Sequence, residues 1–192
     1  LPAGRDFDFI NAEVIEKNLS VNNGKLVLPH GVSYKVLVLP EQTTMRPEVL
    51  HKISELVKAG AVVLGGPPSQ SPSLRNFPKC DDELRGLAAE VWGGADTKKS
   101  GEHKLGKGRV IWGRTLTEVF DESHSVPDIE FRGAAKDANL LFTHRSSPDA
   151  EIYFVSNQKD RAEKIDCAFR IGGRQPELWN AVTGERRILP EW

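Results

Sequence analysis

The sequence is poor in cysteine and has no long hydrophobic run. These two absences argue against a cysteine-based metal site and against a membrane-spanning helix. Only 2 of its 192 residues are cysteines, Cys80 and Cys167, and neither lies in a CxxC or Cys/His cluster that could bind a metal. We expect two separate thiols, although a disulfide between them stays open. No apolar run approaches the roughly twenty residues that a membrane-spanning helix needs.

An excess of charge of either sign is also absent. The 26 basic and 27 acidic side chains give a net charge of −1 and are spread without blocks. Nucleic acid and anionic membranes require a basic excess on one face, so we expect neither as a partner. With 39% hydrophobic and 28% charged residues, the chain can bury a core of one domain, or of one domain with a partial second.

Short motifs for phosphate binding, metal binding and nucleophilic catalysis are missing. The GKG at residues 106–108 precedes a predicted strand, and Arg109 stands where a Walker loop has Ser or Thr. The GGPP at residues 65–68 lacks a third glycine and offers prolines without N–H groups, so we predict turns at both places. The 5 histidines show no HxH or HExxH spacing, and no GxSxG occurs. We therefore predict no catalytic residue, metal or cofactor in this chain.

A clear change of hydrophobic period is present between Ser33 and Gly65. Residues 34–39 are mostly apolar and β-branched, which is typical of a strand buried on both faces. From Pro47 to Gly60 the apolar residues recur at helical spacing, and a second apolar run occupies residues 61–64. Strand, helix and strand predict a βαβ unit with two parallel strands and a right-handed crossover.

Further elements are predicted on both sides of this unit. Before it we expect a strand at 5–9, a brief helix within 10–19 and a strand at 25–28. After it we expect a helix at 80–92, a polar loop at 93–108, a third parallel strand at 109–112 and a short helix at 116–120. The fold class predicted for residues 1–128 is therefore α/β with a parallel sheet.

The pattern shifts near the VPD at residues 126–128. Short strands joined by turn residues are expected at 140–144, 152–157, 165–171, 176–179 and 186–189. This spacing is typical of an antiparallel sheet or half of a β-sandwich, which we assign to residues 129–192. About sixty residues is thin for a complete sandwich, so this region is expected to pack on the first domain or to be truncated.

Acidic residues near the start of the chain are the first candidates for chemistry. Asp6, Asp8 and Glu13 surround Asn11, and paired carboxylates are how most glycosidases cleave sugar bonds. No neighbouring group in the sequence would push the pKa values of Asp6 and Asp8 apart, as an acid/base pair requires. We interpret the stretch as helix capping and solvated charge, and leave a ligand-lining role open.

Tryptophan offers a second candidate. Trp92, Trp112, Trp179 and Trp192 could each stack on a sugar ring, because a flat apolar ring matches the face of a pyranose. Aromatic residues at the ends of strands and helices more often belong to the core. Both interpretations stay open on the sequence alone.

Longer strings carry a family resemblance. They are PAGRDFDFINAEVI, LSVNNGKLVLPHGVSYKVLVLPEQTTMRPEVLHKISELVKAGAVVLG, SPSL, VPDIEF, IYFVSNQKDR and AFRIGGRQPELWNAVTGE, in that order. Together they resemble the segment behind the catalytic barrel in the α-L-rhamnosidase family of large glycoside hydrolases. Residues 93–108 and 130–140 have no placed counterpart.

The resemblance implies a parent that hydrolyses terminal α-L-rhamnosyl linkages with inversion, outside the cytoplasm, using two carboxylates and a calcium ion. Those groups would lie in the barrel, upstream of Leu1. This segment would be a flavodoxin-like or amidotransferase-like three-layer accessory domain plus the first strands of a sandwich. It would brace the barrel or form contacts between subunits. Asp8 and Asn11, at the join to the barrel, are the candidate ligand-binding residues.

Two other functions stay open. The chain could be a carbohydrate-binding or protein-interaction module in its own right, using Trp179 and the β-rich half, or a free-standing flavodoxin-like enzyme or nucleotide binder. The start at Leu1, without an initiator Met, suggests an excerpt from a longer polypeptide. We expect apolar surface and strand edges normally covered by the barrel to drive self-association of the isolated chain.

Overall fold

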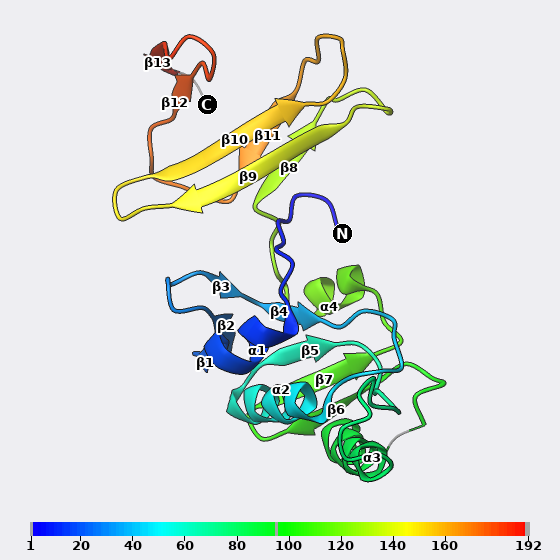
Figure 1. The fold of residues 1–192 in the computed structure, drawn as a ribbon. Coiled ribbons are helices and arrows are strands. Elements are labelled where there is room, and N and C mark those ends of the chain that lie inside the picture. The colour runs from blue at the N-terminus through cyan, green and yellow to red at the C-terminus, as the bar shows by residue number, and fades with distance from the viewer. Residues whose placement is uncertain (1, 95, 191–192) are drawn as a thin grey trace. The chain divides into compact units, whose positions relative to one another are not determined.

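A computed structural model describes residues 2–94 and 96–190 (Figure 1). The contacts within the chain form two compact units, one of Asp8–Ser123 and one of Leu1–Phe7 with His124–Trp192, which we call the α/β unit and the β unit. Contacts thus divide the chain after residue 123 and group its first residues with the β unit. The domain boundary proposed at residue 128 itself stays a prediction.

The α/β unit is built on a four-stranded sheet in the order β4 (Val36–Val38), β5 (Val62–Leu64), β7 (Gly108–Trp112) and β6 (Gly101–Leu105). β4 pairs with β5, and β5 with β7, in parallel, which confirms the predicted βαβ unit and the third parallel strand. β6 pairs antiparallel with β7, so the predicted polar loop at 93–108 is wrong there. The polar residues of β6 suit a strand at the edge of the sheet, which buries little surface. Because β6 is not an apolar run, the sequence pattern did not indicate a strand there.

Helix α2 (Pro47–Ala59) connects β4 to β5 and has the ends that the sequence indicates. Pro47 occupies its first turn, where a missing N–H costs nothing. Gly60 caps the other end with φ of 126°, and its N–H bonds the carbonyls of Leu56 and Val57. The predicted helix is confirmed, including both of its boundary signals.

Helices cover both faces of this sheet. On one face Val63 and Val110 pack with α2 and α3 (Lys79–Trp92) in the main core. On the other face Leu64 and Ile111 pack with Val119 of α4 (Leu116–Glu122). Successive strand residues therefore point into opposite cores, as the continuous apolar runs predict.

Residue 108, at the start of β7, has to be glycine, because the backbone at the end of α2 approaches it closely. A Cβ atom on Gly108 would lie 2.2 Å from the carbonyl oxygen of Ala61 and 2.4 Å from that of Val57. Only glycine lets the end of α2 sit this close to the strand. The GKG sequence thus forms the turn from β6 to β7, as predicted, and not a phosphate loop.

The first part of the α/β unit departs from the predictions. Helix α1 (Ala12–Asn18) is present, and β1 (Ser20–Asn22), β2 (Lys25–Val27) and β3 (Ser33–Tyr34) form a small antiparallel sheet. The strand predicted at 34–39 is split at Lys35, because Tyr34 pairs with Leu26 whereas Val36 pairs with Val62. The strand predicted at 5–9 does not form: these residues have no strand assignment.

The β unit contains antiparallel pairs only, among the residues described. β9 (Leu140–Ser146) pairs with β10 (Glu151–Asn157), β8 (Ile129–Arg132) with β11 (Asp166–Phe169), and β12 (Glu177–Trp179) with β13 (Arg186–Ile188). The antiparallel prediction is confirmed, and β8 is a strand that the sequence analysis did not identify. Mixed α/β architecture with several small sheets is thus the fold class.

The two cysteines are separate, and the helices are short or polar among the residues described. Cys80 is buried and Cys167 half-buried, and both thiols are free, as expected. None of the helices in the described ranges combines the length and the apolar character that a membrane crossing requires.

Candidate functional site

Asp8, one of the two candidate ligand-binding residues, is tied to the small sheet of the α/β unit. The phenol of Tyr34 in β3 donates a hydrogen bond of 2.6 Å to Asp8 Oδ2. Asp6 belongs to the β unit, where it accepts from the N–H of Phe7 and lies 3.9 Å from Arg145. Each carboxylate thus has a partner within its own unit.

Asn11, the other candidate, caps helix α1. Its side-chain oxygen accepts from the N–H of Val14 at 2.9 Å, and its carbonyl accepts from the N–H of Ile15. A cap of this kind stabilises a helix by about 1 kcal/mol. The capping interpretation of Asn11 therefore has a direct structural basis, whereas ligand binding by Asp8 and Asn11 stays a prediction.

A cluster that sequence analysis missed lies in the β unit around His144 of β9. Its Nε2 atom lies 2.8 Å from Oε2 of Glu151, and its Nδ1 atom 3.6 Å from Oδ2 of Asp128. Its ring stacks on that of Tyr153, with centroids 4.0 Å apart and planes 9° apart. The His144 side chain is 15% exposed, so the imidazole is largely shielded from water by these neighbours.

The charges in the His144 cluster are balanced by hydrogen bonds. The hydroxyl of Ser146, and after it His144, lowers the pKa of Glu151 below its ordinary value. The guanidinium of Arg170 donates to the carboxylate of Asp128, and the backbone N–H of Arg170 donates to the backbone carbonyl of Asp128. Burial raises the pKa of Tyr153, and the charge of Asp128 adds to that effect. We interpret the cluster as structural, because the His144 imidazole and the carboxylates of Glu151 and Asp128 all have partners within the β unit.

Two signals in the sequence could have revealed this cluster. His144 follows Leu140 and Phe142 at alternate positions, which places it on the inner face of β9. The turn at residues 147–150 then sets the register that puts Tyr153 directly opposite His144. Asp128, however, comes from outside this hairpin, and nothing local in the sequence indicates its approach.

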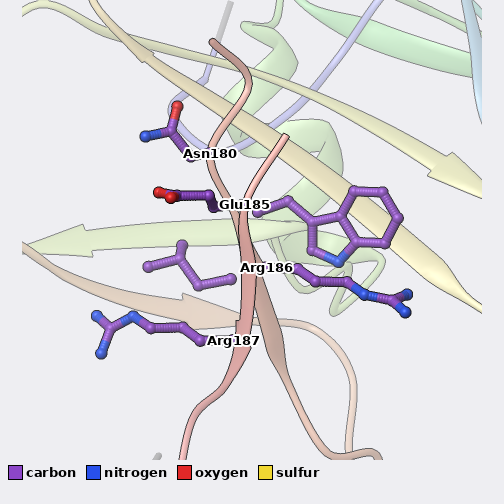
Figure 2. Close-up of a pocket in the computed structure, with 6 residues that line it drawn as sticks. Asn180, Glu185, Arg186 and Arg187 are labelled. Carbon is purple, nitrogen blue, oxygen red and sulfur yellow. The ribbon is translucent and has the colours of Figure 1, made fainter. Parts of the chain in front are cut away.

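The hairpin of β12 and β13 forms a shallow hollow of about 600 Å³. Its lining residues are Leu178, Trp179, Asn180, Glu185, Arg186 and Arg187 (Figure 2). The guanidinium carbon of Arg186 lies 5.7 Å from the centre of the Trp179 ring, and the indole N–H donates to Glu177. Figure 2 shows Arg186 and Arg187 leaving the hairpin on opposite sides, so the two cations do not converge on one ligand.

The described tryptophans differ in whether they lie in the core or are exposed and able to stack on a sugar ring. Trp92 and Trp112 are 1% and 5% exposed and belong to the core. Trp179 is 62% exposed, so for this residue the core interpretation is wrong within the described chain. Trp192 lies outside the described residues. An exposed indole beside a guanidinium is chemically able to stack on a sugar ring.

A protein-family comparison decides what this chain is related to. The family model described as α-L-rhamnosidase, glycoside hydrolase family 106, matches residues 1–190. The chain belongs to this family. The resemblance seen in the sequence strings is thereby confirmed over nearly the whole length.

Two similar proteins are much longer than this chain. A curated protein of Formosa agariphila named "Putative beta-glucuronidase" is 37% identical over 189 residues, which cover 98% of this chain and 15% of the relative. The solved structure of a rhamnosidase from Novosphingobium sp. PP1Y is 33% identical, with a TM-score of 0.86, over 98% of this chain and 18% of that one. The chain thus corresponds to a small part of each of these larger proteins.

Within 2–94 and 96–190, no group of three or more His, Cys, Asp and Glu side chains is arranged to hold a metal ion. These residues do not fit the calcium that the family resemblance implies, and we assign no step to it in this chain. Placement of calcium in a catalytic barrel stays a prediction.

Proposed function

We propose that this chain is a non-catalytic accessory domain of a larger family 106 glycoside hydrolase. The observation that carries the proposal is the comparison: the family model matches residues 1–190, yet the chain spans only 15% and 18% of the two relatives. The chain matches the family model but makes up only a small share of these two proteins. We infer that it supports a neighbouring catalytic domain.

The side chains of the α/β unit support a structural role. Asp8 is bonded to Tyr34, and Asn11 holds the first turn of α1, so both candidates already serve the fold. A glycosidase instead needs two carboxylates facing a sugar-sized space, roughly 5 to 9.5 Å apart. The proposal places the acid and the base of the reaction, and the calcium ion, in the barrel of the longer polypeptide.

The finer fold assignment belongs to this proposal. Parallel strands β4, β5 and β7, with helices on both faces, are the arrangement of flavodoxin-like and amidotransferase-like three-layer domains. The antiparallel pairs of the β unit suit the opening of a β-sandwich. We assign the α/β unit to the first class and the β unit to the second.

The activity of the longer protein is proposed to be hydrolysis of terminal α-L-rhamnosyl linkages. The family description and the Novosphingobium rhamnosidase favour it. The Formosa relative carries a different activity in its name, which makes the sugar specificity the first property to measure. Its partners would be the barrel and a glycan.

A mutation in the longer polypeptide tests the accessory role. Replacing Asp8 by Asn should leave kcat for an α-L-rhamnoside within about twofold, because the residue touches no reacting atom. Asp160→Asn, at an exposed carboxylate of the β unit, is the matched control. A fall in kcat of about a hundredfold or more for Asp8→Asn alone, with an unchanged melting temperature, would refute the proposal.

Trp179 supports a second candidate function, carbohydrate binding by the β12–β13 hairpin. Its indole is 62% exposed, with the guanidinium of Arg186 beside it. A glycan array probed with the chain and with Trp179→Ala distinguishes the two functions. Binding that Trp179→Ala removes would favour the module, and no binding by either protein would favour the accessory domain.

A further inference from the structure

Strands β9 and β10 carry large apolar side chains on both faces. Antiparallel sheets that are half exposed normally alternate, with apolar residues inward and polar residues outward. Here the inner positions hold Phe142 and Val155, and the outer positions Leu141, Ile152 and Phe154. The outer three are 55%, 57% and 53% exposed, which is unusual for side chains of this size in a continuous run.

The pairing register places these outer residues on one surface. Phe154 lies opposite Thr143, Ile152 opposite Arg145, and Leu141 opposite Ser156. We call these six residues the outer face of the β9–β10 hairpin. They form a stripe with apolar side chains along it and a single charged residue, Arg145, toward one end.

The inner face is already occupied. Tyr153 of β10 packs against Phe169 of β11, with ring centroids 4.6 Å apart, and His144 binds Glu151. The β8–β11 pair therefore contacts one side of the hairpin, while Leu141, Ile152 and Phe154 on the other side keep more than half of their surface exposed among the residues described. A two-stranded sheet with one open apolar face is marginal in water.

We propose that the outer face is the docking surface for another part of the same longer polypeptide, an apolar surface with a carboxylate opposite Arg145. This inference rests on the proposed accessory function and identifies the contact through which it acts. Burial of the outer face would remove the side chains of Leu141, Ile152 and Phe154 from water, which favours docking.

Chain length and charge favour this occupant over a second copy of the chain. Most of each relative lies outside the matched segment, because the chain covers 15% of the Formosa protein and 18% of the Novosphingobium rhamnosidase. Arg145 is 71% exposed at its side chain, and Asp6 is 3.9 Å away. Two copies meeting face to face would bring two guanidiniums together, and the exposed 3.9 Å contact of each with Asp6 offsets little of their repulsion.

Thiol accessibility in the longer polypeptide tests the docking. Ile152→Cys is made in a Cys167→Ser background, with Lys136→Cys, in an exposed loop of the same unit, as the control. In the native protein a maleimide should modify the Ile152→Cys variant at least about tenfold more slowly than the Lys136→Cys variant, and equally fast in urea. Equal native rates would overturn the proposal, and so would protection that appears only as protein concentration rises.

Reversing the charge at residue 145 tests whether the docked surface has a carboxylate opposite Arg145. Arg145→Glu added to Ile152→Cys should raise its native labelling rate several-fold, whereas Arg145→Lys should not. Unchanged labelling with Arg145→Glu would exclude a carboxylate partner. Hydrolysis of a rhamnoside by the present chain alone would instead remove the accessory function, so the two failures are distinguishable.

Discussion

The imidazole of His144 lies flat on the phenol ring of Tyr153, its cross-strand neighbour, with centroids 4.0 Å apart. The same imidazole bridges Glu151 and Asp128, so one side chain connects both strands of the hairpin to the segment before β8. Removing it exposes a face of the Tyr153 ring and leaves Glu151 without one of its hydrogen-bond partners.

We predict that His144→Ala destabilises the β unit by about 1–3 kcal/mol, through the lost stacking and hydrogen bond. Urea unfolding followed by near-UV circular dichroism measures the change. His30→Ala, at an exposed turn of the other unit, should stay within about 0.5 kcal/mol. An equal, small effect of both substitutions would show that the His144 cluster does not hold the unit together.

The cluster also predicts a pH dependence. The pKa of Glu151 is lowered from 4.5, first by the Ser146 hydroxyl and then by His144. A carboxyl with a depressed folded pKa contributes stability above its unfolded value and loses it as pH falls through the folded value. Ser146→Ala should therefore reduce stability at neutral pH more than near pH 3. A deficit that is constant from pH 7 to pH 3 would contradict the hydrogen bond to ionised Glu151.

Asn11→Ala should cost about 1 kcal/mol of stability in the α/β unit, because the first turn of α1 loses its cap. Asn11→Ser keeps a capping oxygen and should restore most of it. Thermal unfolding of the three proteins gives the comparison. If Asn11→Ala were as stable as the original chain, the capping role assigned to this residue would be wrong.

Gly108→Ala should destabilise the α/β unit by about 3 kcal/mol or prevent its folding, because the added carbon meets backbone that cannot move aside. The two contacts are the carbonyls of Ala61 and Val57. Gly66→Ala is the control, since a carbon added there meets nothing within 4 Å. Comparable stability of the two variants would refute the close approach of α2 and β7.

In isolation, without the rest of the longer polypeptide to cover the outer face of the β9–β10 hairpin, the chain should self-associate weakly through this face at high concentration. Phe154→Lys should lower the apparent mass at high concentration, whereas Val182→Lys, at a 94% exposed turn residue of another hairpin, should not. Light scattering over a concentration series measures this. A strict monomer at all concentrations would count against it.

The sequence predicted an element correctly where its hydrophobic periodicity and the residues at its ends indicate the same structure. Pro47, Gly60 and the spacing between them define α2, and continuous apolar runs identify β5 and β7 as strands buried on both faces. The prediction failed for β6, whose residues Glu102 and Lys104 give no apolar signal, although its partner β7 does. Pairing between distant segments, rather than local propensity, makes such an edge strand.

The candidate sites show the same limit. Asn11 could be recognised as a helix cap, because the signal is local. Asp128 and His144 are brought together only by the pairing of β8 and β9 with other strands, and no local pattern encodes that encounter. The exposure of Trp179 was likewise open in the sequence, since an indole near a turn fits a core as well as a surface.

The account depends most on the assignment of bond cleavage to another part of the longer polypeptide. Turnover of 4-nitrophenyl α-L-rhamnopyranoside by residues 1–192 alone, at micromolar protein and over hours, tests this directly. We predict release of nitrophenol indistinguishable from the buffer rate, while the longer polypeptide hydrolyses the same substrate. Saturable release by the short chain, abolished by Asp8→Asn, would contradict the account.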